Sequence, residues 1–578
     1  MSASRAEPSE ITGPKGSSLR VLRILTRSGV ASPARPDRNV RQLLSLARWG
    51  ATVAGGYRAA VARSPHRLAV IDEHRSVTFG ELHGRAVRLA NGLERLGAVP
   101  GSRVAVLCRN HAWFVESVVA AAELGADVVL VNTGLTVRAT AEVLRAHEPA
   151  VVIADAEFAD HVAAARLGVP FLVAWPDGTG PGTGPGTGPG TGPGTGPGTG
   201  RPFSRSAQRD AGTATVDDVI AGASAAKRRP PKRPGRIVVL TSGTTGAPKG
   251  AQRANPPGLS AAAGLISRIP LRARESVLVA TPLFHMWGLA GLQISMALRN
   301  TLVLQRRFEP KAALQAIEEQ RCAVVFGVPV VLQRIMELPP ELRDSYDVSS
   351  LRIVATSGSA IPTPLVTAFM DVFGDVLYNF YGSTEVSWAA IADPADLRIA
   401  PNTAGRPPLD SRLKVLDDRG EVVPRGVTGR IFVWNNLLFE GYTSGGTKEH
   451  RAGYMATNDR GHLDSSGRLF VHGRDADMIV CAGEQLFPRD VEDLLASVQD
   501  IREAAVVGVP DADQGQRFAA YVVVRPGAEM TAPQVRGVVA RYLPGNAVPR
   551  DVVFVDALPR NATGKVVVRD LPPSLAGA

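Results

Sequence analysis

The sequence predicts an α/β protein built from parallel sheets that are covered by helices. Strand-like apolar runs alternate with helical segments along the first half of the chain, and this rhythm is typical of βαβ units. The 44% content of apolar residues suits a globular protein, and 578 residues are too many for one hydrophobic core. We therefore expect two or more domains.

The elements expected in the first half are a helix that begins after Thr78 and several short strands. The helix covers residues 79–96. The apolar stretch around residues 118–131 contains Glu123 and Asp127, so we expect a helix followed by a buried strand there, not a membrane span. Further apolar runs predict strands at residues 103–107, 150–153, 170–173 and 237–240.

Cysteine usage and the N-terminal residues favour a reducing compartment. The three cysteines, Cys108, Cys322 and Cys481, show neither pairing nor metal-ligand spacing. Scattered charges and the lack of a sustained apolar core in the first 30 residues argue against a secretory signal. We expect a cytoplasmic protein, with membrane association as an open alternative.

The net charge of +11 is confined to two segments. Residues 1–50 and 227–236 each carry +6, so the rest of the chain is close to neutral. A neutral body argues against nucleic-acid binding and leaves solvated linkers or contact with an anionic membrane surface. One helical face in the first segment would hold Val40, Leu43, Leu44 and Ala47. This face predicts either an interfacial amphipathic helix or a helix packed on the protein itself.

A Gly-Thr-Gly-Pro repeat fills residues 178–200. Its side chains cannot build a core, and recurring proline and glycine prevent helix and strand ladders. We expect a disordered insertion in a surface loop, which costs stability only slowly as it lengthens.

The most informative stretch is residues 241–250, Thr-Ser-Gly-Thr-Thr-Gly-Ala-Pro-Lys-Gly, which follows the strand predicted at 237–240. Glycine lets the backbone approach a polyphosphate, hydroxyl groups donate hydrogen bonds and lysine adds a positive charge. The stretch therefore predicts a nucleotide-phosphate loop. It is not a Walker A loop, because Pro248 and Gly250 stand where that pattern has a glycine and a hydroxyl residue.

This string resembles the phosphate-binding signature of the adenylate-forming superfamily, which includes acyl-CoA synthetases, the adenylation domains of peptide synthetases and luciferases. Among its members we expect a fatty-acyl-CoA synthetase for medium- or long-chain acids. The resemblance implies ATP binding, and it places Thr244 in the catalytic and magnesium sites as well. The ATP-binding residues of the loop would be Thr241, Ser242, Gly243, Thr244, Thr245, Gly246 and Lys249.

Residues 378–385, Tyr-Asn-Phe-Tyr-Gly-Ser-Thr-Glu, resemble the adenine and metal segment of this superfamily. The resemblance implies that Tyr381 stacks on adenine and that Asn379 meets its exocyclic amine. Thr384 would contact the α-phosphate, and Glu385 would hold Mg²⁺ because a hard cation prefers carboxylate oxygen. The other ATP-binding residues implied here and in the preceding loop are Gly382, Ser383, Gly358, Ser359 and Ala360.

Two segments further on resemble the ribose site and the hinge. Asp459 would accept from both ribose hydroxyls, although Asn458 stands where the family usually has glycine. Asparagine also tolerates left-handed backbone, so the assignment stands. Arg474 is implied to contact the ribose as well. Ala476 replaces the usual Asp or Lys of the hinge, which puts charge-based locking of the hinge in doubt.

The last two motifs lie near the C-terminus. Residues 480–484 resemble the loop that meets the pantetheine thiol, with Gly483 and Glu484 as its contacts, and residues 559–565 end in the expected catalytic residue Lys565. The resemblance implies a large N-terminal domain of stacked, helix-covered sheets and a small mobile α+β C-terminal domain. The expected divisions are a basic extension at 1–55, an adenylation domain at 56–474 and a lid domain at 475–578.

The implied reaction activates a carboxylic acid. The carboxylate attacks the α-phosphorus of ATP, pyrophosphate leaves, and a thiol attacks the acyl-adenylate. Mg²⁺ on Glu385 and the ammonium group of Lys565 would neutralise the charge that develops in the first step. Only 13 residues follow Lys565, so we expect an external thiol, coenzyme A or alternatively a free acyl-carrier protein. The expected partners are the acid, ATP and CoA, with a homodimer and peripheral membrane contact as further candidates.

The acid itself is less well specified. Amino-acid-activating relatives have an aspartate near positions 284–285, but residues 281–288 contain no carboxylate and resemble fatty- and aryl-acid CoA ligases. A medium- or long-chain fatty acid is the main expectation. An aryl acid, or a fatty acyl-AMP ligase that loads a carrier protein, is the alternative. The acyl-pocket residues would be His285, Gly288, Gly327 and Val328, with His285 also in the catalytic set.

Two other classes are compatible with part of these motifs. A non-catalytic AMP- or acyl-binding relative would be expected to lack Lys565 or Glu385, and both are present. A luciferase-like oxygenase shares the motifs, so only an assay separates it from a ligase.

Overall fold

The computed structural model describes residues 14–30, 36–176, 214–241, 249–252, 260–443, 445–481, 484–511, 514–561 and 564–573, with only the backbone of 14–18, 241 and 249. The predicted insertion at 178–200 lies outside these residues. The chain forms two compact units. The first contains residues 1–63, 249–303 and 308–578, and the second contains residues 64–248 and 304–307. The boundaries at 55/56 and 474/475 stay predictions.

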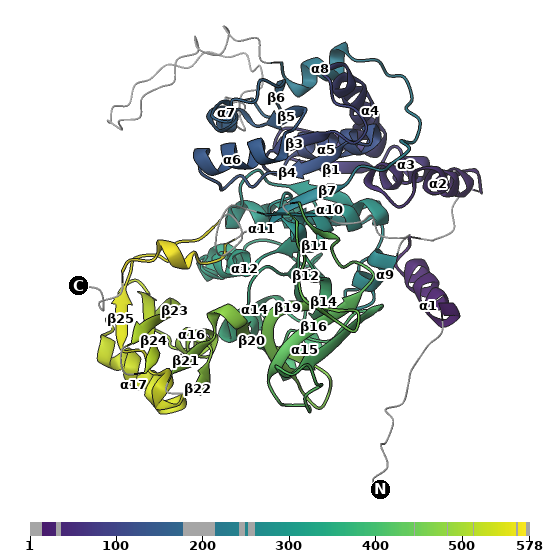
Figure 1. The fold of residues 1–578 in the computed structure, drawn as a ribbon. Coiled ribbons are helices and arrows are strands. Elements are labelled where there is room, and N and C mark those ends of the chain that lie inside the picture. Colours follow the sequence, from purple (N-terminus) through teal and green to yellow (C-terminus); the bar gives the residue numbers. More distant parts are fainter. Residues whose placement is uncertain are drawn as a thin grey trace. The chain divides into compact units, whose positions relative to one another are not determined.

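The second unit is a parallel α/β sheet, as the alternating sequence pattern predicted (Figure 1). Its strand order is β7(Ile237–Thr241)-β4(Asp127–Leu130)-β3(Arg103–Leu107)-β5(Val151–Ala154)-β6(Phe171–Val173). The hairpin β1(Leu68–Ile71)–β2(Ser76–Thr78) precedes it. Its helices are α4(Phe79–Arg95), α5(Ala112–Leu124), α6(Val137–His147), α7(Ala159–Ala163) and α8(Val216–Gly222).

Helix α4 illustrates why these segments fold as predicted. Thr78 accepts a hydrogen bond from the backbone N–H of Glu81, and the Glu81 carboxylate accepts from the backbone N–H of Thr78. This reciprocal capping box satisfies two donors at the helix start. The apolar face of α4, which includes Phe79, Leu82 and Leu89, is buried. The helix predicted over residues 79–96 is thereby confirmed to within one residue.

The largest sheet of the first unit has the order β14(Ser387–Ala392)-β13(Leu377–Ser383)-β12(Ile353–Thr356)-β11(Cys322–Gly327)-β9(Ser276–Val279)-β10(Thr301–Leu304). β9, β11, β12 and β13 are parallel to one another, and β14 returns antiparallel. The helices that accompany it are α9(Ser260–Ile266), α10(Met286–Leu298), α11(Pro310–Glu319), α12(Pro329–Met336), α13(Pro340–Arg343), α14(Thr363–Phe373) and α15(Pro394–Ile399).

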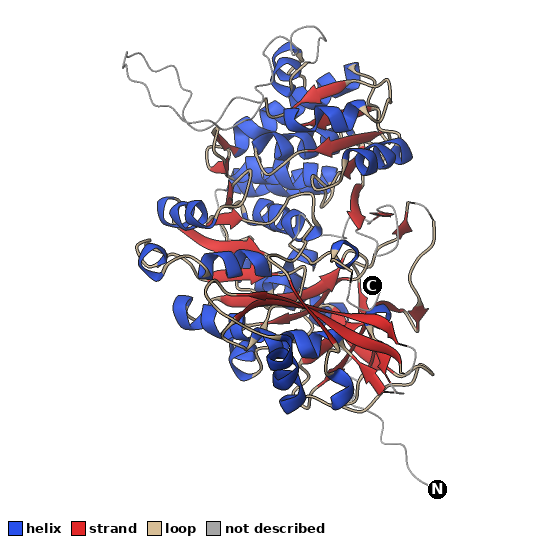
Figure 2. Cartoon of the chain, turned by 90° about the vertical axis from the view of Figure 1, so that its left-hand side faces the viewer, coloured by secondary structure: helices blue, strands red, loops and turns tan. Residues whose placement is uncertain are grey.

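Two smaller sheets complete the first unit, and Figure 2 shows their strands beside helices. One has the order β15(Ser411–Leu416)-β16(Gly429–Asn435)-β19(Tyr454–Leu463)-β18(His450–Arg451), with β20(Leu469–Arg474) paired to β19. Strand β8(Lys249–Gln252) pairs with β17(Gly441–Tyr442). The C-terminal sheet has the order β22(Glu484–Leu486)-β21(Ile479–Cys481)-β24(Gly515–Val524)-β23(Ile501–Asp511), with β25(Asp551–Phe554) beside β24. Helices α16(Pro488–Ala496) and α17(Ala532–Tyr542) pack on it to form the smaller α+β domain.

The N-terminal segment folds into the helices α1(Pro14–Arg27), α2(Pro36–Trp49) and α3(Val53–Arg63) of the first unit. Within the described residues, no helix combines the length and the hydropathy that a bilayer span requires.

Candidate active site

The predicted nucleotide and acyl residues gather where the parallel strands of the largest sheet end. The carboxyl ends of parallel strands share one edge of a sheet, and open α/β sheets bind ligands at that edge. His285 follows β9, Val328 follows β11 and Gly358 follows β12. A Cβ atom added to Gly358 would lie 3.5 Å from Val328 Cγ1 and 4.0 Å from His285 Cε1, so the three residues line one small space. Ser359 and Ala360 continue the exposed loop after Gly358.

Strand β13 carries the residues that were predicted to meet adenine. Asn379 and Tyr381 lie on one face of the strand because side chains alternate along it. The Asn379 amide group donates to the backbone oxygen of Thr403 at 3.2 Å, which fixes its orientation. Gly382 stands at an irregularity in the β13–β14 ladder, where a Cβ atom would lie 1.9 Å from the oxygen of Ser387. Only glycine fits this bend, which redirects the chain toward Glu385.

The ribose residues predicted from the sequence are brought together across two strands. Asp459 and Arg474 are direct partners in the β19–β20 ladder, and Asp459 Oδ1 lies 4.0 Å from Arg474 Nε. The Tyr381 hydroxyl donates to Asp459 Oδ2 at 2.5 Å, which joins the adenine and ribose residues. Asn458 has φ of 68°, so it adopts the left-handed backbone that the family glycine would supply. Burial raises the pKa of the Asp459 carboxyl, against the opposing effects of Tyr381 and Arg474.

Glu385 has the surroundings expected of a magnesium ligand. Its Oε1 accepts from the hydroxyl of Tyr442 and its Oε2 from the hydroxyl of Ser383, each at 2.8 Å. Burial alone would raise the pKa of Glu385, but Lys448 and these two hydrogen bonds outweigh it and hold the pKa below its ordinary value. The carboxylate is therefore ionised at neutral pH, as oxygen ligation of Mg²⁺ requires. Thr384, expected at the α-phosphate, immediately precedes it.

Lys448 and Tyr442 are site residues that the sequence did not reveal. The Lys448 ammonium group donates to the backbone oxygen of Thr457 at 2.8 Å and interacts electrostatically with Glu385 and Asp459. It therefore places a positive charge near both Glu385 and Asp459, the residues predicted to hold Mg²⁺ and the ribose. Neither residue sits in a motif, and the only signal in the sequence is their position between two motif segments.

His285, which was predicted for the acyl pocket, is the N-terminal cap of α10. Its Nδ1 accepts from the backbone N–H of Trp287 at 3.5 Å, so Nε2 carries the proton of the neutral ring. Burial lowers the pKa of His285 to about 4, which keeps the ring neutral at pH 7. The Nε2–H group can donate to a substrate carboxylate without protonating it.

Of the two glycines assigned to the acyl pocket, Gly288 is required by close packing, whereas a side chain at Gly327 would make an ordinary contact. A Cβ atom on Gly288 would lie 2.2 Å from the oxygen of Pro282, and one on Gly327 would lie 3.4 Å from Val331 Cγ1. Aromatic rings lie beside them. Trp287 stacks on Phe380 with centroids 4.6 Å apart and tilts against Phe326 at 5.1 Å.

Lys565 lies on a tight turn of the C-terminal domain. Its backbone N–H donates to Asn561 Oδ1 at 3.0 Å, and Gly564 has φ of 79°. The pKa of Lys565 is lowered by the surrounding protein, which desolvates the ammonium group, and by Arg474; Asp477 and Asp459 oppose this. Lys565 therefore interacts electrostatically with Asp459 and Arg474, the residues predicted to contact the ribose. Both lie at least 91 positions earlier in the chain.

At the hinge, Asp475 makes charge contacts, whereas its neighbour Ala476 has no charged group. Asp475 accepts from Arg460 Nε at 2.5 Å and lies 3.4 Å from Arg430 Nε. Glu484, from the predicted thioester loop, accepts from Asn546 Nδ2 at 3.2 Å. Its neighbour Gly483 lies outside the described residues, as do Ser242, Gly243, Thr244, Thr245 and Gly246 of the phosphate loop. For Thr241 and Lys249 the structure gives backbone only, at the end of β7 and the start of β8.

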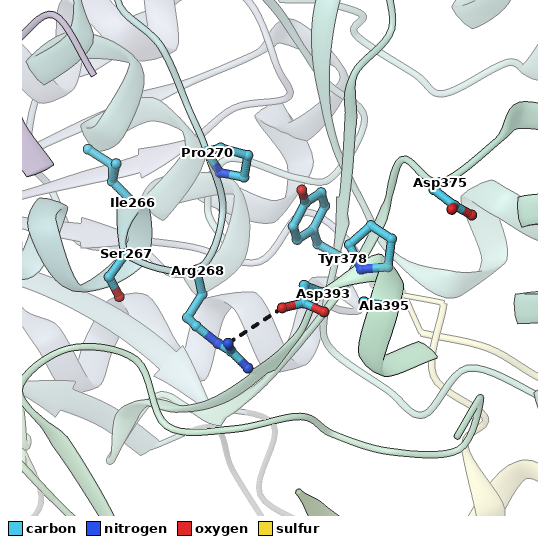
Figure 3. A pocket seen from close by; sticks show the side chains of 9 residues that line it. Ile266, Ser267, Arg268, Pro270, Asp375, Tyr378, Asp393 and Ala395 are labelled. Carbon is cyan, nitrogen blue, oxygen red and sulfur yellow. Dashed lines mark ion pairs between the residues drawn. The ribbon is translucent and has the colours of Figure 1, made fainter. Parts of the chain in front are cut away.

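A surface pocket of about 460 Å³ lies on the opposite face of β13 and is separate from this site. Figure 3 shows Tyr378, which alternates with Asn379 along the strand, beside the ion pair of Arg268 and Asp393. The pocket is broad and open to solvent, and no predicted site residue lines it.

Comparisons with known proteins agree with this geometry. Residues 57–443 match the family described as AMP-binding enzyme, and residues 490–565 match the AMP-binding enzyme C-terminal domain. A feruloyl-CoA synthase from Amycolatopsis sp. is 30% identical over 509 residues, which are 87% of this chain and 95% of that protein. The 3-[(3aS,4S,7aS)-7a-methyl-1,5-dioxo-octahydro-1H-inden-4-yl]propanoyl:CoA ligase of Mycobacterium tuberculosis is 31% identical over 533 residues, covering 89% and 97%. The structure of ATP-bound MatB from Rhodopseudomonas palustris superposes with a TM-score of 0.75 at 25% identity, covering 89% and 97%.

Proposed function

The chain belongs to the AMP-binding enzyme family and is an AMP-forming acid–thiol ligase that uses ATP, Mg²⁺ and CoA, and we propose that its acid substrate carries a ring. An aryl acid is the first candidate. The fatty-acid substrate expected from the motifs is not supported by the relatives, whose names specify feruloyl and bicyclic propanoyl groups. The aryl-acid alternative fits them better.

The observation that carries this proposal is the aromatic cluster beside His285. The Trp287 backbone N–H is bonded to His285, which is implied to meet the substrate carboxylate. The Trp287 ring packs against Phe326 and Phe380. Aromatic rings prefer offset-stacked or edge-to-face partners and contribute about 0.5–1.5 kcal/mol per pair beyond area burial. A flexible alkyl chain gains no such directional contact. The cluster therefore favours a planar ring over an alkyl chain.

The residues divide the work as follows. Asn379, Tyr381 and Asp459 bind the nucleoside, and Glu385 would hold Mg²⁺, which would supply positive charge to the phosphates. His285 orients the acyl carboxylate through Nε2–H, and Lys448 lies along the phosphates. Lys565 donates to the oxygens that gain charge when the carboxylate attacks. Glu484 and the adjoining Gly483 meet the thiol after the C-terminal domain has moved.

Pyrophosphate release over a panel of acids tests the substrate proposal. We expect kcat/KM for cinnamate-type and indole-type acids to exceed that for hexanoate and palmitate by at least about tenfold, because each lost aromatic pair costs on the order of 1 kcal/mol. The assay is run with and without CoA. Higher kcat/KM for the alkyl acids would overturn the ring proposal, and thioester formed only with an acyl-carrier protein would replace CoA as acceptor. A homodimer and a cytoplasmic location stay predictions.

We also propose peripheral contact with an anionic membrane surface through helix α2. The apolar face predicted there is turned outward: Val40 is 55% exposed, Leu43 66% and Leu44 47%. The opposite side of the helix, with Gln42 and Trp49, packs on the protein. Helix α2 thus packs on the protein, as one of the two alternatives predicted, while its apolar face stays exposed. Arg41 and Arg48, two exposed arginines on α2 itself, add positive charge to this helix.

Vesicle sedimentation of the full chain tests this contact. We expect binding to vesicles that contain phosphatidylserine, weaker binding to phosphatidylcholine alone, and release by salt because exposed charges are screened. The double variant Leu43→Glu, Leu44→Glu should bind at least about tenfold less, since each leucine contributes roughly 1.5–3 kcal/mol when buried. Ile399→Glu on α15 is the matched control, because it puts the same charge in place of an exposed apolar side chain on another helix. Ile399 is 69% exposed, and this variant should bind normally. Equal binding by both variants would refute the contact.

A further inference from the structure

A cavity of about 120 Å³ lies in the first unit beneath the N-terminal helices. Small side chains create it, because three pairs of alanines from α3, α9 and α10 form much of its wall. These are Ala59, Ala60, Ala261, Ala262, Ala290 and Ala297. Ala290 and Ala297 are seven positions apart and therefore share one face of α10. Longer side chains at these positions would fill the space.

Two polar side chains at the edge of this cavity are engaged with the protein. Gln42 Oε1 accepts from Arg63 Nη1 at 2.9 Å, and Arg299 donates to the backbone oxygen of Gly29 at 2.7 Å. The remaining wall is mainly aliphatic. Apolar cavities of this kind stay dry and accept apolar guests, and one of roughly 150 Å³ binds benzene. A guest here would therefore be apolar and close to one ring in size.

A series of aromatic contacts connects the cavity with the acyl side of the active site. Trp388 lines the cavity and contacts Phe380 edge-to-face, with centroids 5.3 Å apart. Phe380 in turn stacks on Trp287, the residue whose backbone N–H is bonded to His285. The indole N–H of Trp388 is buried and has no hydrogen-bond partner among the described residues, so no polar contact fixes the ring.

The wall opposite Trp388 can also adapt. Met296 lies so close to Gly56 that a Cβ atom there would be 2.4 Å from Met296 Cε. Methionine has three rotatable bonds and re-packs easily around irregular shapes. Val30, Gln42 and Leu46 close the cavity from the N-terminal segment, and the family match begins only at residue 57. This part of the chamber is therefore built by residues outside the matched family region.

We infer that this cavity receives the distal apolar group of the acid substrate, past Trp388, and that the enzyme selects acids that carry a second ring-sized apolar group. The inference rests on the proposed function, since it extends the same acyl site. The proximal ring would lie against Trp287 and Phe380. The distal group would displace the Trp388 ring and occupy the space between α3 and α10.

A filled cavity tests the inference. Ala60→Leu adds three carbon atoms to the wall, whereas Ala62→Leu makes the same change on α3 at a residue that does not line the cavity. For benzoate we expect both variants to keep wild-type kcat/KM within about twofold. For biphenyl-4-carboxylate, Ala60→Leu should lose at least about tenfold and Ala62→Leu should not, because overpacking costs about 1–3 kcal/mol.

A second measurement does not depend on catalysis. Biphenyl-4-carboxylate without ATP should raise the Tm of the wild type and of Ala62→Leu, because a ligand of the native state stabilises it, but not that of Ala60→Leu. Unchanged selectivity together with equal Tm shifts in both variants would overturn the cavity assignment. A wild type that releases no pyrophosphate with any acid, yet shows the Tm difference, would overturn the proposed function and leave the cavity as a ligand site.

Discussion

Lys565→Ala is expected to lower acyl-adenylate formation by at least about a hundredfold to a thousandfold while leaving thioester formation from supplied acyl-adenylate close to normal. Removal of one preorganised group that stabilises developing charge typically has an effect of this size. The lysine is placed for that role because it shares its surroundings with Asp459 and Arg474, which are implied to bind the ribose of ATP. Pyrophosphate release measures the first step, and thioester appearance from synthetic acyl-adenylate and CoA measures the second.

Lys311→Ala is a matched control for this prediction. Lys311 is an exposed lysine on α11, remote from the motif residues in the sequence, and its removal should change neither step. An equal loss of both steps in Lys565→Ala would refute the division of labour, since it would mean that the lysine also serves the thioester reaction.

If Lys565 serves only the first half-reaction, the C-terminal domain must be able to leave its position before the second. Two side-chain contacts of this domain are weak enough to break for such a movement. The Arg502 guanidinium group donates two hydrogen bonds of 3.0 Å to the Glu337 carboxylate. The Gln333 amide group donates one of 3.0 Å to Glu503. The Arg502 side chain is 40% exposed and that of Glu337 is 30% exposed. Exposed ion pairs contribute about 0–1 kcal/mol each. We propose that the domain moves between the half-reactions, as the family resemblance implies.

The motifs located most of the site because they encode local geometry. Gly382 must be glycine at the bend of β13, and Asn458 must tolerate left-handed backbone, so both requirements are visible in a short string of residues. The order of parallel strands then brings such strings to one sheet edge. For this reason His285 and Val328, which were predicted for the acyl pocket, are found beside Gly358, which was predicted for the adenine loop.

Residues that act through long-range contacts could not be located in this way. Tyr442 reaches Glu385 across 57 positions, and Lys448 joins Glu385 to Asp459 without belonging to a motif. The direction of the apolar face of α2 was equally undetermined, because periodicity shows which residues share a face but not what covers it. Substrate preference is hidden for the same reason: the chamber combines N-terminal helices with α9, α10 and Trp388, and its lining residues lie outside the quoted motifs.

Glu385→Gln is expected to reduce acyl-adenylate formation by about a hundredfold or more and to raise the Mg²⁺ concentration that half-saturates the reaction. The amide keeps the size of the side chain but lacks the charge that a hard cation requires. The pKa of Glu385 is held below its ordinary value, so the wild-type group stays ionised through the neutral range. The Mg²⁺ requirement of the wild type should therefore not change between mildly acidic and mildly basic pH.

Pyrophosphate release at graded Mg²⁺ concentrations, at several pH values, checks both parts of this expectation. Glu341→Gln provides the control, because it removes an exposed carboxylate from α13 by the same substitution and should leave the Mg²⁺ dependence unaltered. Far-ultraviolet circular dichroism and the Tm establish that the Glu385 variant folds, with Tyr442 and Ser383 still able to bond the amide. If Glu385→Gln kept the wild-type half-saturation and lost only maximal rate, Glu385 would act on the phosphates without holding the metal.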